Sequence, residues 1–143
     1  PTALSKCIFL NKMDKMAYLE TLSNLDLILD PLHRGCGTTA FDALSLGIPI
    51  ASMPGNHSKS RLVQAMYNIM GINQPPLARS PDHYVELCNR LLNSKTTRSK
   101  LKASIKNNYW KVLQSNDNST KEIVSFLPSC LYERGKPPLG ESS

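Results

Sequence analysis

The most informative part of the chain combines a glycine-rich turn with the start of a helix, in the sequence Gly35-Cys-Gly-Thr-Thr-Ala-Phe-Asp-Ala-Leu-Ser-Leu-Gly-Ile-Pro49. The apolar run 25–30 that precedes it is typical of a strand buried on both faces. Gly35 and Gly37 allow the backbone to turn sharply and to approach a ligand closely. The stretch therefore predicts a strand–turn–helix unit.

The helix of this unit is expected to begin with Thr38 as its N-cap and to end at Gly47. Its free N–H groups and the positive end of its dipole then face the turn. In an open parallel sheet such a turn lies at the carboxyl edge of the strands, where nucleotides bind. The stretch thus indicates an anion site, although an ordinary strand–helix connection with a threonine cap also fits it. Since neither Gly-x-Gly-x-x-Gly nor a following Lys-Ser/Thr is present, dinucleotide and P-loop sites are disfavoured.

Strands and helices are predicted to alternate along the chain. Strands are expected at 7–10, 25–29 and 48–53, with a connection or weak strand at 73–79; helices are expected after Asp14, at 39–46, 59–70 (capped by Ser58), 81–92 and 98–113, and from about Ser119 to Pro128. This alternation predicts an α/β fold with a parallel sheet. The sheet is expected to be partial, because a complete nucleotide-binding lobe has about six strands.

Composition sets the outer bounds of the function. The 143 residues, 41% of them apolar, suit one domain with a real core. No apolar run approaches the roughly 18 residues of a membrane span, so we expect no membrane association. The four cysteines are irregularly spaced and form no ligand pattern with the histidines, so we expect neither a metal site nor a disulfide framework. A reduced, intracellular protein is the simplest interpretation.

The net charge of +6 is concentrated in one segment. Between positions 90 and 111 the basic residues are Arg90, Lys95, Arg98, Lys100, Lys102, Lys106 and Lys111, and no acidic residue interrupts them. This basic segment either contacts RNA or an acidic partner, or is a solvated helix face. Because no aromatic stacking motif accompanies it, we favour the solvated face and do not expect nucleic acid as a partner.

Several motifs in a fixed order resemble the O-linked N-acetylglucosamine transferase family, which includes SPINDLY-type and bacterial relatives. The motifs are Asp30-Pro31, Gly35-Cys-Gly-Thr-Thr-Ala-Phe-Asp42-Ala-Leu, Gly47-Ile-Pro49, Met53-Pro-Gly55 and Ser60-Arg61. The resemblance runs from about Cys7 to about Lys111 and covers the C-terminal, donor-binding half of the catalytic region. It implies a GT-B glycosyltransferase with two Rossmann-like lobes, an inverting, metal-independent mechanism and a nucleotide-sugar substrate.

The resemblance also implies a division of the chain. Residues 1–113 correspond to the nucleotide-sugar-binding lobe, incomplete at its N-terminus, residues 114–134 to a C-terminal helix, and residues 135–143 to a flexible tail. We expect the chain to begin inside a longer protein, whose acceptor lobe and tetratricopeptide repeats lie upstream. The chain alone is then expected to be inactive, and none of its residues is a candidate general base.

A donor site follows from the resemblance position by position. Its predicted residues are Met13, Lys15, Tyr18, Gly35, Gly37, Thr38, Thr39 and Asp42. The threonine pair would hold the diphosphate, the lysine the ribose and phosphates, the aspartate the ribose hydroxyls, and the aromatic ring and the Met13 backbone the base. The simpler alternatives are a helix acid for Asp42, a solvated side chain for Lys15 and core packing with Leu22 for Tyr18.

One position departs from the animal enzymes of the family. They carry a histidine where this chain has Gly37, and a glycine-rich loop is more similar to the bacterial and SPINDLY-type branches. UDP-N-acetylglucosamine is the leading donor, and GDP-fucose for a SPINDLY-type O-fucosyltransferase is the alternative. The full-length enzyme would transfer the sugar to Ser/Thr of proteins in the cytoplasm or the nucleus. A non-catalytic nucleotide-binding or basic interaction fragment is a further alternative.

Overall fold

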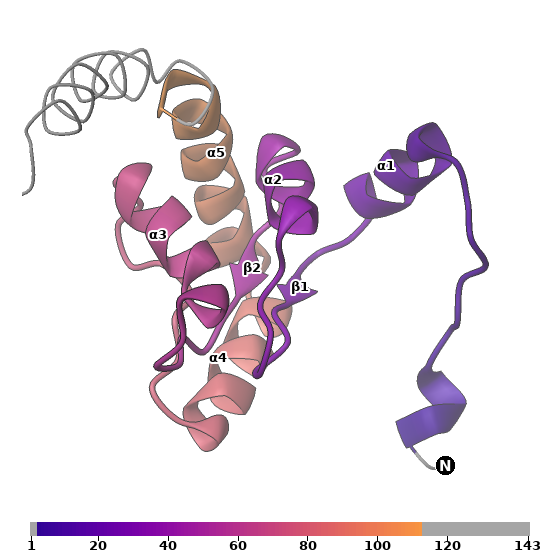
Figure 1. Ribbon diagram of the computed structural model, residues 1–143, viewed down its shortest axis with the longest axis horizontal. Helices are drawn as coiled ribbons and strands as arrows, with labels where there is room; N and C mark the ends of the chain where they lie inside the picture. The colour runs from indigo at the N-terminus through magenta and orange to yellow at the C-terminus, as the bar shows by residue number, and fades with distance from the viewer. Residues whose placement is uncertain (1–2, 113–143) are drawn as a thin grey trace, which may run out of the picture.

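Two short parallel strands lie at the centre of the fold (Figure 1). In the computed structural model, which describes residues 3–112, β1 (Ile28–Leu29) pairs with β2 (Ile50–Ala51) in the register Ile28–Ile50 and Leu29–Ala51. A parallel bridge between Ser52 and Leu77 extends the sheet on the far side of β2. The predicted fold class is confirmed: the chain is an α/β unit with a partial parallel sheet, followed by helices.

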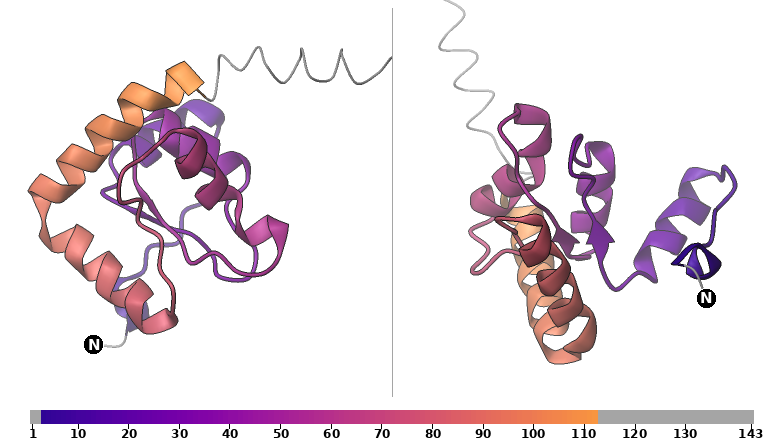
Figure 2. Two further views of the ribbon diagram at one scale, coloured as in Figure 1. Left: turned by 90° about the vertical axis from the view of Figure 1, so that its left-hand side faces the viewer. Right: turned by 90° about the horizontal axis from the view of Figure 1, so that it is seen from below.

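Helices connect and cover these strands. They are η1 (Ala3–Lys6), α1 (Lys15–Ser23), α2 (Thr38–Ser45), η2 (Ser58–Ser60), α3 (Leu62–Ile69), α4 (Pro81–Asn93) and α5 (Lys95–Val112). Both α2 and α4 contact β2, and α5 packs along α2 and α4 (Figure 2). The core lies between these elements, and Leu44, Ile50, Tyr67 and Ile105 are fully buried within it. Leu101 and Tyr109 of α5 are buried too.

Most of the predicted helix ends are confirmed, because they depend on local signals. The Asp14 carboxylate accepts a hydrogen bond from the N–H of Ala17 at 2.9 Å, and Ser80 caps α4 with Pro81 at its first position. Gly47 and Gly71 follow α2 and α3 with φ of 78° and 61°, the left-handed conformation that ends helices.

Two predicted caps are wrong. The N-cap of α2 is Gly37, and Thr38 is the first residue inside the helix. Ser58 begins a separate 3₁₀ turn, so α3 starts later than predicted, at Leu62. In both places the backbone conformation of the turn decides where the helix begins. The position of one serine or threonine in the sequence does not predict that conformation.

The predicted strand at 7–10 is also wrong. This segment forms no regular structure, and Ile8 and Phe9 are 86% and 87% exposed. It runs between η1 and α1, away from the body formed by α2 to α5, in both Figure 1 and the right-hand view of Figure 2. An extended apolar segment becomes a strand only where a neighbouring strand offers hydrogen bonds, and within residues 3–112 none lies beside it.

The same reason explains why β1 and β2 are shorter than predicted. Leu29 was expected to be buried on both faces but is 57% exposed, since β1 has a strand neighbour on one side only among residues 3–112. The predicted helix from Ser119 and the segments 114–134 and 135–143 lie outside the described residues.

The free edge of β2 beside Ile50 is closed by a side chain. The phenol oxygen of Tyr67 accepts a hydrogen bond from the N–H of Ile50 at 2.8 Å and donates one to its carbonyl oxygen at 3.0 Å. Tyr67 is fully buried, and burial raises the pKa of its phenol. One tyrosine therefore does here what an additional strand would do elsewhere in a sheet.

Candidate functional site

A cavity of about 700 Å³ opens between α1 and the first turn of α2. Several predicted donor-site residues line it: Met13, Lys15, Tyr18, Thr38, Thr39 and Asp42. Gly35 and Gly37 do not line this cavity, which we call the α1–α2 cavity. The structure thus brings residues from two helices and the segment before α1 to one place, although the chain separates them widely.

The N-terminus of α2 faces this cavity without a side-chain cap. Gly37 has no side chain to offer, and the N–H of Ala40 donates to the Gly37 carbonyl at 3.0 Å. The hydroxyls of Thr38 and Thr39 lie in the same turn. Open N–H groups, hydroxyls and the positive end of the helix dipole favour an anion.

An ion pair spans the cavity from one wall to the other. The Nζ atom of Lys15 lies 2.6 Å from Oδ2 of Asp42 and 5.3 Å from the centre of the Tyr18 ring. The Lys15 side chain is 61% exposed and that of Asp42 is 24% exposed. Because exposed pairs of this kind contribute little stability, a ligand can separate the two groups at small cost.

The side chain of Tyr18 lies between the hydrophobic core and the α1–α2 cavity. It is half-buried, packs against the core cluster and also lines the α1–α2 cavity. The neighbouring Met13 contacts the Thr21 hydroxyl through its sulfur at 3.7 Å. Both the stacking role and the core role that the sequence left open for Tyr18 therefore remain compatible with its position.

The turn between β1 and α2 is held by the buried carboxylate of Asp30, to which the sequence analysis assigned no role beyond its place in the Asp30-Pro31 motif. Asp30 is 4% exposed and accepts hydrogen bonds from the Cys36 N–H at 2.6 Å and from the Ser52 hydroxyl. A Cβ atom on Gly35 would lie 2.9 Å from the Lys59 carbonyl oxygen. Gly35 is therefore required by packing within the protein. In the sequence, the feature that could have pointed to a role for Asp30 is its place as an acidic residue at the end of an apolar strand.

Burial and the Asp30 carboxylate together raise the pKa of the Cys36 thiol from 9.0 to about 11. Burial also raises the pKa of Tyr84 to about 12. A raised pKa means that the folded state holds the proton more tightly than the unfolded state. The stabilisation that the protonated Cys36 thiol contributes is therefore complete below pH 9 and is lost as the pH rises through 11.

We therefore expect the denaturant midpoint to fall as the pH rises between about 9 and 11. The variant Cys36→Ala keeps the backbone N–H that Asp30 holds but has no thiol to titrate, so its midpoint should fall less steeply. Urea unfolding at pH 7.5, 9, 10 and 11 measures both slopes. Equal slopes for the two proteins would contradict the assignment to Cys36.

The basic segment 90–111 is not a single surface. Arg98 lies 3.2 Å from the Asp26 carboxylate and donates to the Leu91 carbonyl at 2.8 Å, and Lys102 donates to the Leu25 carbonyl at 3.2 Å. Through these contacts, Arg98 and Lys102 connect α5 to α4 and to the segment that precedes β1. Their charges are therefore explained by internal contacts.

No group of three or more His, Cys, Asp or Glu side chains that could hold a metal ion occurs within residues 3–112. Over the same range, the helices are all too short or too polar to cross a bilayer.

The fold is that of a GT-B-like fragment with helices. A solved structure similar to it is that of a mutant O-GlcNAc transferase from Thermobaculum terrenum, with a TM-score of 0.72 and 21% sequence identity over 82% of this chain. The chain spans 22% of the length of that protein. At this identity the similarity shows the fold alone. No protein-family profile and no curated protein matches the chain.

Proposed function

We propose that the α1–α2 cavity binds the nucleotide-sugar donor of a protein O-GlcNAc transferase-like glycosyltransferase, with UDP-N-acetylglucosamine as the donor. The observation that carries this proposal is the cavity itself, in which an uncapped helix N-terminus with two hydroxyls faces a lysine, a carboxylate and an aromatic ring. The fold of the Thermobaculum terrenum enzyme supports it. The acceptor would be a Ser/Thr hydroxyl of an intracellular protein.

The diphosphate, the ribose and the base of the donor each have a matching group in this cavity. The diphosphate would lie on the first turn of α2, with Thr38, Thr39 and Lys15 donating hydrogen bonds to it. The Asp42 carboxylate, released from Lys15, would accept from the ribose hydroxyls. The base would lie against Tyr18, with its edge on the backbone of Met13. Donor binding thus requires the Lys15–Asp42 pair to open.

The catalytic contribution of such a site is electrostatic. Negative charge builds up on the leaving diphosphate as the bond to the sugar breaks, and hydrogen bonds that strengthen with this charge lower the barrier. No residue lining the cavity is placed as a general base toward an acceptor, so the base and the acceptor lobe would come from elsewhere. We expect the chain by itself to transfer no sugar to a peptide.

Calorimetry of the chain with two donors tests the proposal. We expect UDP-N-acetylglucosamine to bind more tightly than GDP-fucose, because the fold is similar to that of an O-GlcNAc transferase. The opposite order would favour the SPINDLY-type alternative. Binding of neither donor would leave the non-catalytic interaction fragment as the better explanation and would contradict the proposal.

Substitution of Tyr18 separates the base from the diphosphate. If the ring stacks on uracil, Tyr18→Ala should weaken UDP binding by roughly 1 to 3 kcal/mol and barely change the binding of inorganic pyrophosphate. If the ring is chiefly core, the variant should lose ~3 kcal/mol or more of unfolding free energy and bind both ligands less well. Two titrations and one thermal denaturation distinguish these results. An equal loss for both ligands with a lowered melting temperature would overturn the stacking role.

A further inference from the structure

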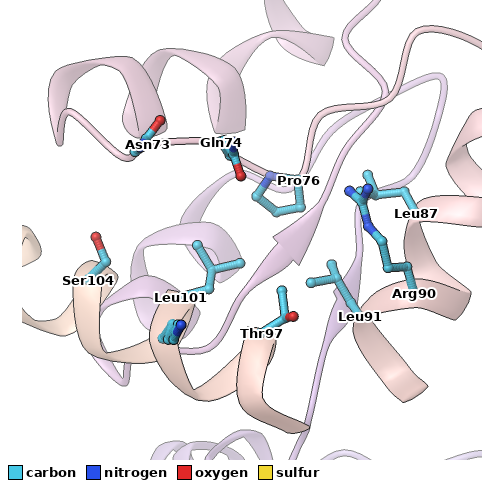
Figure 3. Close-up of a pocket in the computed structure, with 10 residues that line it drawn as sticks. Asn73, Gln74, Pro76, Leu87, Arg90, Leu91, Thr97, Leu101 and Ser104 are labelled. Carbon is cyan, nitrogen blue, oxygen red and sulfur yellow. The ribbon is translucent and has the colours of Figure 1, made fainter. Parts of the chain in front are cut away.

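A second cavity of about 570 Å³ lies between the segment 73–76 and the helices α4 and α5 (Figure 3). It shares no lining residue with the α1–α2 cavity. Its volume falls in the range of roughly 300 to 1,000 Å³ that is usual for small-molecule sites. Nothing in the proposed donor function uses this space.

The floor of this α4–α5 cavity is apolar. Leu91 of α4 and Leu101 of α5 point toward Pro76 across the cavity in Figure 3, and Leu87 completes this surface. All four residues belong to the buried part of the protein. The floor is therefore rigid and suited to an apolar group.

The rim is cationic and polar. Arg90 and Lys100 line the cavity together with amide and hydroxyl side chains such as Gln74 and Thr97, and none of the lining residues is acidic. Within residues 3–112, Arg90 and Lys100 form neither an ion pair nor a side-chain hydrogen bond. In this they differ from Arg98 and Lys102, whose charges are engaged within the fold. Their hydrogen-bond donors are available to a ligand.

The backbone at the rim is strained at one position. Gln74 has a φ of 53°, the left-handed conformation that favours glycine, and is the only non-glycine residue with positive φ within residues 3–112. Its side chain lines the cavity. Strain of this kind persists where the surrounding structure holds a residue in place, and it is concentrated at binding sites.

We propose that the α4–α5 cavity binds a small organic anion, with its apolar body on the leucine floor and its charged group between Arg90 and Lys100. An anion is favoured because both rim charges are positive and no lining carboxylate opposes it. An apolar body is favoured because water on the buried floor would find no hydrogen-bond partner there. The site is distinct from the donor site and would be occupied independently of it.

Backbone-amide NMR of the chain with benzenesulfonate as the probe tests this site. The probe combines an aromatic ring with a permanent negative charge. We expect saturable shifts in the amides of Asn73, Gln74, Thr97 and Ser104 and smaller shifts around Thr38 and Thr39. The neutral analogue benzenesulfonamide should bind at least about fivefold more weakly, because it makes no charged hydrogen bond.

The variant Arg90→Gln with Lys100→Gln should weaken benzenesulfonate binding about tenfold or more. Lys95→Gln removes one positive charge from the same helix outside the cavity and should leave the affinity within about twofold. Equal losses in the two variants, or no saturable shift at the cavity amides, would overturn the proposal. Shifts produced there by single-stranded RNA and not by benzenesulfonate would also overturn it, in favour of an extended basic surface.

Discussion

Replacing Thr38 and Thr39 together with alanine is expected to weaken UDP binding by about 2 to 4 kcal/mol, roughly 30-fold to 1,000-fold. Each hydroxyl in the first turn of α2 would donate to a diphosphate oxygen, and a hydrogen bond to a charged group contributes ~1.5 to 3 kcal/mol. The sum is reduced because neighbouring contacts are not additive. The backbone N–H groups of this turn are retained, so some affinity should remain.

The control for this double variant is Thr96→Ala with Ser99→Ala. It removes two exposed hydroxyls of α5 that do not line the α1–α2 cavity, and it should leave UDP affinity unchanged. Calorimetry gives the affinities, and circular dichroism shows that both variants are folded. A folded Thr38→Ala/Thr39→Ala variant with unaltered UDP affinity would refute the diphosphate assignment.

Tyr67→Phe should lower the unfolding free energy by about 1 to 3 kcal/mol, although it deletes one oxygen atom only. The substitution leaves the N–H and carbonyl of Ile50 without the partner they have at 2.8 and 3.0 Å, and the site is fully buried. A buried backbone group without a partner costs its full desolvation energy.

Tyr84→Phe is the matched control for this variant. Its hydroxyl donates to the carbonyls of Asp30 and Ala51 at the longer distances of 3.2 and 3.3 Å, from a half-buried position. The loss on removing it should be smaller, because water can replace the hydroxyl and the Ala51 carbonyl keeps its hydrogen bond from the Asp30 N–H. Urea unfolding of both variants gives the comparison. A larger loss for Tyr84→Phe would contradict the role of Tyr67 at the edge of β2.

The elements that the sequence predicted well are those set by neighbours in the chain. Asp14, Ser80-Pro81, Gly47 and Gly71 place helix ends through contacts within one turn, and such signals are readable from the residues alone. The strands depend on partners distant in the chain. The segment 7–10 has the composition of a strand, yet it has no strand beside it within residues 3–112 and remains irregular.

The candidate site shows the same division. The prediction of an anion site at the turn before α2 followed from glycines, hydroxyls and the helix dipole, whereas the predicted roles of Lys15 and Tyr18 came from the resemblance to a family. The contacts of Asp30 with Cys36 and Ser52, and of Tyr67 with Ile50, join residues that no local pattern links. They became visible only when the fold placed these residues together.

An amide NMR titration of the chain with UDP tests most directly whether the α1–α2 cavity is a nucleotide diphosphate site. We predict saturable shifts in the amides of residues 13–18 and 38–42, with the largest at Thr38 and Thr39. In the Thr38→Ala/Thr39→Ala variant these shifts should need a UDP concentration roughly 30-fold to 1,000-fold higher. Saturable binding of UDP that shifts amides elsewhere and leaves those of residues 38–42 unchanged would contradict this assignment.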